Sequence, residues 1–184
     1  MTRIDPRSFA TKQISVGGTP TAIGVLYSRV WVGTNSRSIT VLAGDGSLDG
    51  GVPNLHGSGV PVAITSSDGV WVLRGGQGLT RVDPRVSVAA RRTKPYEYLV
   101  HPDSPGSRAN PVDVDSLDHG LGDNTIWLLS SSDHLLQRIG THGTDNDRVL
   151  TKISVGSAPA RLAVAPHVVW VLDPGARALY EITY

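Results

Sequence analysis

The hydrophobic residues of this chain gather in short runs that are separated by clusters of Gly, Asp, Ser, Asn and Pro. Four of these runs share an apolar-Trp-apolar centre, at Trp31, Trp71, Trp127 and Trp170. Short apolar runs bounded by turn-forming residues are typical of buried β-strands rather than helices. The pattern therefore predicts an all-β chain with a tryptophan-bearing strand in each of four units.

The spacing of the tryptophans indicates an internal repeat. Successive tryptophans are 40, 56 and 43 residues apart, which is the length of a four-stranded unit once an insertion is allowed between the second and third units. The sequence Ile-Ser-Val-Gly occurs at residues 14–17 and again at 153–156, and residues 2–7 resemble residues 80–85. We infer that most of the chain is built from copies of one unit.

Each unit is expected to contain four antiparallel strands, a to d, with the tryptophan on strand b. The predicted units span about residues 18–55, 58–92, 111–156 and 159–184, the last together with 8–16, and residues 94–110 form an insertion loop. Four such sheets around an axis make a β-propeller, and the chain is expected to form one propeller domain over residues 1–184. The tryptophans would then pack between neighbouring blades.

The fourth unit ends before a d strand, so its edge needs a partner. Residues 9–16 align with residues 149–155 of the third unit, which predicts that this N-terminal strand closes the last of about four blades. Residues 2–6 resemble a further c strand, however, and this leaves two alternatives. Two copies exchange end strands as a homodimer with an eight-bladed ring, or the chain is a fragment of a longer propeller.

Composition agrees with this fold and excludes several functions. The 184 residues include 21 Gly, 12 Pro and 14 Asp but only 2 Glu, a bias toward tight turns. The net charge of +1 and the scattered basic residues exclude a nucleic-acid footprint. Residues 168–172 are too short a run to span a membrane, and residues 1–18 lack a secretory signal. We expect a cytoplasmic protein as written, or an extracellular one if it is cut from a longer secreted or anchored parent.

The motifs resemble a known group of repeats. The cadence Ile-Ser-Val-Gly-x-x-Pro, then Val-Trp-Val, then Thr-Arg-(Ile/Val)-Asp-Pro is similar to bacterial YVTN and NHL-like propeller repeats over nearly the whole chain except residues 94–110. Such repeats occur in streptogramin (virginiamycin B) lyase and in sensor domains of actinobacterial kinases. The resemblance implies a propeller fold, with either a binding role or lyase chemistry.

The loops between strands b and c are the first candidate site, because such loops gather on one face of a propeller. The candidate ligand-binding residues in them are Asn35, Arg37, Arg74, Gln77, His134, Asp173 and Arg177. Arginine supplies paired donors for carboxylate or phosphate, and Asp133 beside His134 is a candidate catalytic pair for proton transfer. The competing interpretation is that these loops are polar only because water surrounds them.

The insertion offers the second candidate site. Tyr96 and His101 lie in a proline-rich segment that would cap the same face, and tyrosine suits planar or sugar-like ligands. A segment without a ligand is the alternative. No cofactor is expected. Asp113 and Asp115 lie on one face of a predicted strand and suggest Ca²⁺ or Mg²⁺, although a solvated strand edge explains them better.

The preferred interpretation is a non-catalytic binding propeller, a sensor or scaffold, that takes a small anionic molecule or a protein partner. The alternative is a lyase or cyclase acting on a secondary metabolite, with His134 as base, Asp133 as its orienting partner and Tyr96 or His101 from the cap. A third interpretation is an assembly module whose exposed ends pair with another copy.

Overall fold

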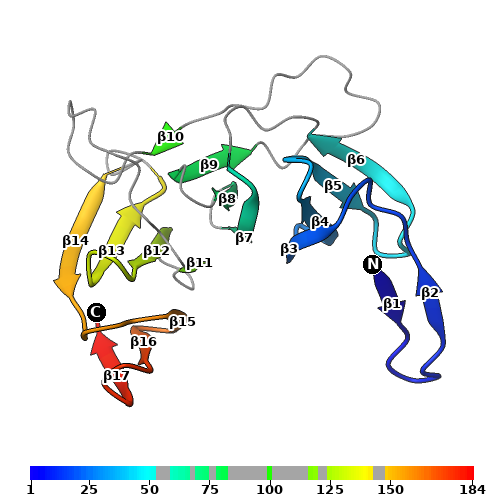
Figure 1. Ribbon diagram of the computed structural model, residues 1–184. Coiled ribbons are helices and arrows are strands. Elements are labelled where there is room, and N and C mark those ends of the chain that lie inside the picture. Colours follow the sequence, from blue (N-terminus) through cyan, green and yellow to red (C-terminus); the bar gives the residue numbers. More distant parts are fainter. Residues whose placement is uncertain are drawn as a thin grey trace.

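The computed structural model describes residues 1–52, 59–66, 69–74, 78–82, 99–100, 116–119, 124–142 and 148–184. Within these ranges the regular secondary structure consists of seventeen strands. The strands form one hairpin and four antiparallel sheets, and Figure 1 shows them in an arc with the N-terminal hairpin at one end and the C-terminal sheet at the other. No helix in these ranges has the length and apolar character needed to cross a bilayer.

The sheets follow one another along the chain, and in each of them the strands pair with their sequence neighbours. The hairpin contains β1 (Thr2–Ile4) and β2 (Thr11–Gln13). Sheet 1 contains β3 (Pro20–Leu26), β4 (Arg29–Thr34), β5 (Ile39–Leu42) and β6 (Leu48–Val52). Sheet 2 contains β7 (Pro61–Ser66), β8 (Val70–Arg74), β9 (Gly78–Val82) and β10 (Leu99–Val100). Sheet 3 contains β11 (Ser116–His119), β12 (Thr125–Ser130), β13 (Leu135–Gly140) and β14 (Val149–Ser154). Sheet 4 contains β15 (Arg161–Ala165), β16 (Val168–Asp173) and β17 (Ala178–Thr183).

The predicted tryptophan strands are confirmed as β4, β8, β12 and β16, the second strand of each sheet. Every residue of β12 is buried, which explains its unbroken apolar run, because both faces of the strand are covered. The edge strand β17 instead alternates between half-buried and exposed residues, because only one of its faces is covered. Burial on one or both faces thus accounts for the two sequence patterns.

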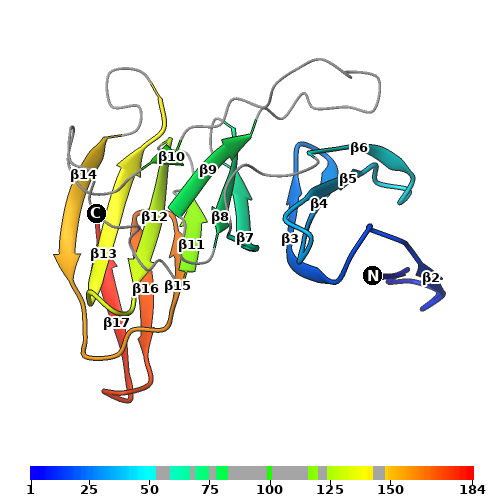
Figure 2. The same ribbon diagram turned by 45° about the horizontal axis from the view of Figure 1, so that its top comes forward.

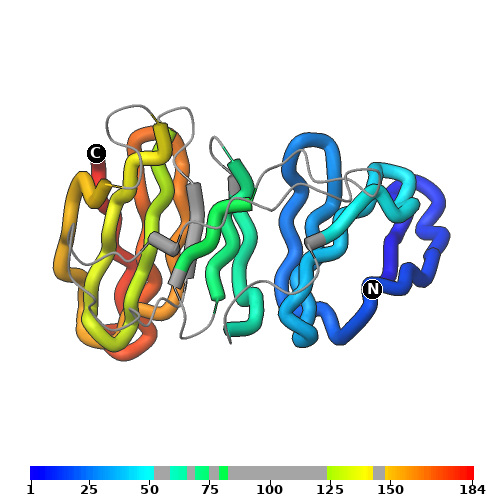
Figure 3. The backbone as a smooth tube through the Cα atoms, turned by 90° about the horizontal axis from the view of Figure 1, so that it is seen from above, coloured from blue at the N-terminus to red at the C-terminus, as the bar shows by residue number. Residues whose placement is uncertain are grey.

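The sheets stack through their inner strands. β3, β7, β11 and β15 lie beside one another on the concave side of the arc, and Figure 3 shows the same succession from above. Between consecutive sheets lies an apolar cluster around a fully buried tryptophan. Trp31 packs with Ile64, Val70 and Val72 of sheet 2. Trp71 and Trp127 contact sheets 3 and 4 in the same way. The predicted packing of these three indoles between neighbouring sheets is therefore confirmed.

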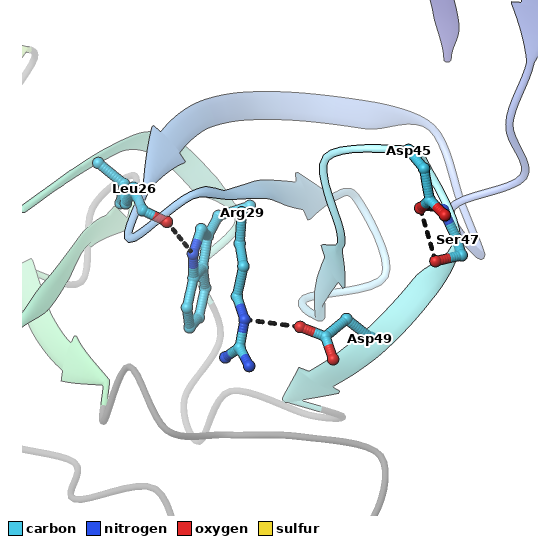
Figure 4. Close-up of polar contacts among 6 residues, drawn as sticks. Leu26, Arg29, Asp45, Ser47 and Asp49 are labelled. Carbon is cyan, nitrogen blue, oxygen red and sulfur yellow. Dashed lines mark hydrogen bonds and ion pairs between the residues drawn. The ribbon is translucent and has the colours of Figure 1, made fainter.

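A hydrogen bond further fixes the first indole. Trp31 Nε1 donates to the carbonyl oxygen of Leu26 at 3.3 Å (Figure 4), so the burial of the ring leaves its N–H paired. Arg29 lies beside the ring and forms an ion pair with Asp49 at 2.6 Å. Arg81 and Arg138 lie over the rings of Trp71 and Trp127 at 5.5 and 5.8 Å. Arginine stems and charges therefore cover indoles in the first three sheets.

The fourth strand of sheet 2 differs from expectation. The sequence predicts the d strand of the second unit at residues 86–90, which lie outside the described residues. The strand that pairs with β9 is β10, through Leu99↔Thr80 and Val100↔Leu79. β10 falls within residues 94–110, the expected insertion loop. Part of that segment therefore belongs to the sheet itself.

The expected closure of the last sheet by the N-terminal strand is not what the structure shows. β2 pairs with β1 in the register Thr2↔Gln13, Arg3↔Lys12 and Ile4↔Thr11, and sheet 4 has three described strands. Local pairing costs little chain entropy because a tight turn joins the two strands. Asp5 stabilises that turn by accepting hydrogen bonds from the backbone N–H groups of Arg7 and Ser8 at 2.8 and 2.9 Å. Sheet 4 lies at the far end of the arc (Figure 1).

Candidate functional site

Three of the predicted ligand-binding residues lie in the turns that join the second and third strands of sheets 1, 3 and 4. Each lies late in the turn before the third strand of its sheet: Arg37 is two residues before β5, and His134 and Arg177 directly precede β13 and β17. All three are exposed and have a left-handed backbone, with φ of +60°, +53° and +52°. Glycine or asparagine is the usual occupant of such a position. In all three turns a basic or ionisable side chain stands there instead.

These turns lie on one face of the molecule because the connectors between sheets tie them together. In the connector of residues 155–160, Pro159 O accepts a hydrogen bond from Ser131 Oγ in the turn of sheet 3, and Val155 N donates one to His134 O at 2.9 Å. It also reaches sheet 4, where Ser157 N donates to Asp173 Oδ2 at 2.7 Å. Figure 2 shows this connector running below the strands it joins. We call this side, with turns 35–38, 131–134 and 174–177, the connector face.

The connector before sheet 1 has the same arrangement. Asn35 donates its backbone N–H to the carbonyl of Thr19 at 2.9 Å, and its Oδ1 accepts from Thr19 N at 3.0 Å. Asn35 was a predicted ligand-binding residue. In the structure its side-chain oxygen holds the connector of residues 14–19 against the turn of sheet 1.

Beneath the exposed turns lies a set of buried polar side chains. The residue three positions after each tryptophan ends the second strand, and all four of these residues are polar and at most 3% exposed. They are Thr34, Arg74, Ser130 and Asp173. Arg74 and Asp173 were predicted as ligand-binding residues, and both lie below the surface. Thr34 and Ser130 were not predicted, although their place after the apolar run is visible in the sequence.

Asp173 binds backbone groups from two segments. Its Oδ1 accepts from Ala176 N at 2.9 Å, and its Oδ2 accepts from the N–H groups of Ser157 and Ala158 at 2.7 and 3.2 Å. The hydrogen bond from Ala176, aided by those from the connector, holds the pKa of the Asp173 carboxyl below its usual value, while burial opposes this. The carboxylate therefore remains charged at neutral pH and fixes both the turn and the connector.

The candidate catalytic pair has a different set of contacts. Asp133 Oδ2 accepts from Ser130 Oγ at 2.9 Å, and Asp133 N donates to the same hydroxyl at 3.2 Å. Within residues 124–142 no hydrogen bond joins Asp133 to His134, and both residues are exposed. The carboxylate of Asp133 therefore closes its own turn.

Other predicted residues cannot be placed. Gln77, Tyr96 and His101 lie outside the described residues, as do Asp113 and Asp115. Among the residues that are described, no three His, Asp or Glu side chains cluster in a way that could hold a metal ion.

Comparisons with known proteins agree with the geometry. No family model matches the chain, and no curated protein matches it in sequence. Solved structures do match. Virginiamycin B lyase from Staphylococcus aureus, solved as a catalytically inactive variant with quinupristin, superimposes with a TM-score of 0.71 at 15% identity, over 99% of this chain and 59% of that one. The β-propeller domain of Cps50 (Swd1) from Myceliophteria thermophila gives 0.75 at 8% identity, over 98% and 57%.

The fold is a β-propeller. The sheets described above are its blades, and the predicted resemblance to streptogramin lyase is confirmed at the level of the fold. The chain spans less than two thirds of the length of these two propellers. The computationally designed Ika4 protein is nearer in length, with a TM-score of 0.63 at 12% identity, over 94% of this chain and 97% of that one. Identities this low carry the fold and no activity.

Proposed function

We propose that the chain is a binding module whose connector face takes an anionic ligand or the acidic surface of a protein partner. One observation carries the proposal. Arg37, His134 and Arg177 each have a left-handed backbone late in the turn before the third strand of a blade, exposed on one face. A side chain at such a position costs backbone strain that glycine would avoid. Three side chains of similar chemistry at such positions support a shared role.

The chemistry of the face favours anions. Each guanidinium has a planar set of donors that matches carboxylate or phosphate, and the imidazole of His134 can add an N–H donor. Within the described ranges, the carboxylates of Asp133 and Asp173, which lie at or beside these turns, do not pair with the basic side chains. Asp173 is buried among backbone donors, and Asp133 is held by Ser130. The propellers that superimpose on this chain include the Cps50 (Swd1) domain as well as a lyase, and because one fold hosts many functions, the fold is compatible with a binding role.

The first test measures anion binding at the connector face. Pyrophosphate and a short poly-glutamate peptide serve as probes, with backbone amide NMR shifts of Ser157 and Ala158 as the local readout and calorimetry for affinity. Arg37→Ala and Arg177→Ala are each expected to weaken probe binding by about tenfold, because a charged hydrogen bond is lost. His134→Ala is expected to weaken probe binding by a smaller factor, because it removes a single imidazole donor.

Matched control variants lie on the opposite face. Arg148→Ala removes an exposed arginine beside β14, and His167→Ala removes an exposed histidine that has the same left-handed backbone, with φ of +61°. Neither change is expected to alter probe binding. The proposal is wrong if the rim variants bind both probes like the parent chain, or if the controls weaken binding equally.

A lyase is the second candidate, favoured by the superposition of 99% of the chain on virginiamycin B lyase. In that case His134 would act as the base and Asp133 would have to leave Ser130 to orient it. Incubation with quinupristin, followed by mass spectrometry, separates the two functions. Turnover that His134→Ala abolishes and His167→Ala preserves would favour the lyase over the binding module.

A further inference from the structure

The two ends of the arc expose apolar surfaces that the inner sheets bury. On sheet 4, Val169, Val171 and Tyr180 face sheet 3, so Trp170, Leu172 and Leu179 face outward. Leu172 and Leu179 are 46% and 60% exposed, and Trp170 is only half-buried, whereas the other three indoles are fully buried. On sheet 1, Ile23 and Val25 are 61% and 74% exposed on the face that points away from sheet 2.

These surfaces correspond to the two sides of an interface that the chain already contains. Trp31 packs on Ile64, Val70 and Val72 of the next sheet. Cross-strand pairing places Ile64 opposite Val72, and it places Ile23 opposite Val32. Ile23, Val30 and Val32 of sheet 1 are therefore the equivalents of Ile64, Val70 and Val72, the residues of sheet 2 on which an indole packs. Sheet 4 is the last sheet among the described strands, so no following sheet packs on the indole of Trp170.

The N-terminal hairpin covers only part of the receiving surface. Met1, Ile14 and Val16 pack against Val32 and Leu42, and they leave Ile23 and Val25 exposed. All six strand residues of β1 and β2 are exposed, and an isolated two-stranded hairpin is marginally stable. Arg3 Nη1 donates a hydrogen bond to Asp45 O at 3.0 Å, and the Met1 ammonium group donates one to Ile14 O at 3.1 Å. The pairing nevertheless sets Arg3 directly opposite Lys12, and these like charges weaken it.

The strand register identifies a better partner for β2. In sheet 3, Trp127 pairs with Arg138, and Arg138 pairs with Thr151 of β14. In sheet 4 the equivalent pair is Trp170 and Glu181. The repeat offset of 139 residues makes Lys12 of β2 the equivalent of Thr151. If β17 took the place of β1, Glu181 would stand opposite Lys12, and a pair of opposite charges would replace a pair of like charges.

We propose that two copies of this chain associate head to tail, with β17 of each copy displacing β1 of the other and pairing with its β2. The Trp170 surface of one copy then packs on the Ile23 surface of the next. The occupant is a second copy rather than the same chain because the two surfaces lie at opposite ends of the arc (Figures 1 and 3). Two such contacts close a ring, in which each copy contributes four completed blades.

Charge substitutions test the pairing, with association measured by sedimentation velocity across a dilution series. The parent chain is expected to form a species of about 39 kDa, twice its mass of 19.5 kDa. Glu181→Lys sets two like charges opposite each other in the dimer and is expected to raise the dissociation constant by about tenfold. Lys12→Glu is expected to raise it further, because it also strengthens the β1–β2 hairpin by pairing with Arg3.

The double variant Lys12→Glu/Glu181→Lys shows whether the effect of Glu181→Lys on association reverses direction. Glu181→Lys weakens association of the parent chain, yet it is expected to strengthen association of the Lys12→Glu chain by about tenfold, because the opposite charges are restored. All of these side chains are exposed, so folding is preserved. Arg148→Glu, at an exposed site away from both surfaces, is the control and leaves association unchanged. A monomeric parent chain, or the same sign in both backgrounds, would overturn the proposal.

Cysteine trapping distinguishes a second copy from closure within one chain. The sequence has no cysteine, so Lys12→Cys and Glu181→Cys introduce single thiols at residues predicted to face each other across strands, which suits a disulfide. Mixing the two single variants under mild oxidation is expected to give a covalent dimer, whereas each alone does not. A double variant that forms only an intrachain disulfide, or a mixture that does not cross-link, would refute the exchange between copies.

Discussion

Two glycines of the repeated Ile-Ser-Val-Gly motif show that neighbouring residues determine how strongly a position requires glycine. Gly17 and Gly156 both have a left-handed backbone, with φ of +76° and +54°. A Cβ added to Gly17 would meet nothing within 4 Å, whereas one added to Gly156 would overlap Asp173 Oδ2. The same motif therefore has one position where only the backbone demands glycine and one where the packing demands it too.

Alanine substitutions separate these two demands. Gly17→Ala is expected to destabilise the chain by about 1 kcal/mol, the cost of a left-handed alanine. Gly156→Ala is expected to cost roughly 3 kcal/mol, because it also displaces the carboxylate that holds Ser157 and Ala158. Urea unfolding measures both values. Equal losses would show that the contact with Asp173 contributes nothing.

In the candidate site, the positions of the turns were predictable from the sequence, but the exposure of their polar side chains was not. The turns were predicted correctly because their Gly, Asp and Asn content has a direct conformational cause. Which polar side chain points outward was not predictable. In the sequence, Arg74, Asp173, Arg37 and Arg177 are all charged residues that follow an apolar run. In the structure, Arg74 and Asp173 end a second strand and are buried, whereas Arg37 and Arg177 lie late in the following turn and are exposed.

At the scale of elements, the tryptophan strands were predictable because central strands covered on both faces leave a continuous apolar run. Edge strands leave a weaker signal. β10 has two residues and β2 has three, too few to show an alternation, and their place depends on which neighbour is available. The fourth strand of sheet 2 and the N-terminal strand expected to complete sheet 4 were therefore the elements that sequence reasoning placed least well.

Indole truncation tests the stacking of the blades. Trp71 is fully buried between sheets 2 and 3, so Trp71→Ala is expected to cost roughly 3–5 kcal/mol. Trp170 lies on the outer surface of sheet 4 and is half-buried, so Trp170→Ala is expected to cost only about 1 kcal/mol in a dilute, monomeric sample. Thermal unfolding of both variants gives the comparison. A melting temperature of Trp71→Ala within a degree or two of the parent would contradict the packing.

At the scale of the whole molecule, the sequence repeat predicted the blades but not what the two end blades pack against. Each inner blade is covered by two neighbours, and the clusters around Trp31, Trp71 and Trp127 record this. The end blades contain the same strand types, so the sequence supports closure by the same chain and by another copy equally well. The geometry distinguishes the two, because Ile23 and Trp170 lie on surfaces at opposite ends of one arc.

Association through these ends makes thermal stability depend on protein concentration. A dimer that dissociates as it unfolds gains RT ln 10, about 1.4 kcal/mol, for each tenfold rise in concentration. Divided by the unfolding entropy expected for two chains of 184 residues, this raises the melting temperature by about 2 °C per tenfold. Differential scanning calorimetry over a concentration series measures the slope. The Lys12→Glu chain serves as the comparison, because weakened association should flatten its slope toward zero. A parent chain whose melting temperature stays constant over that series would show that the exposed ends remain apart and that the arc is stable as a single copy.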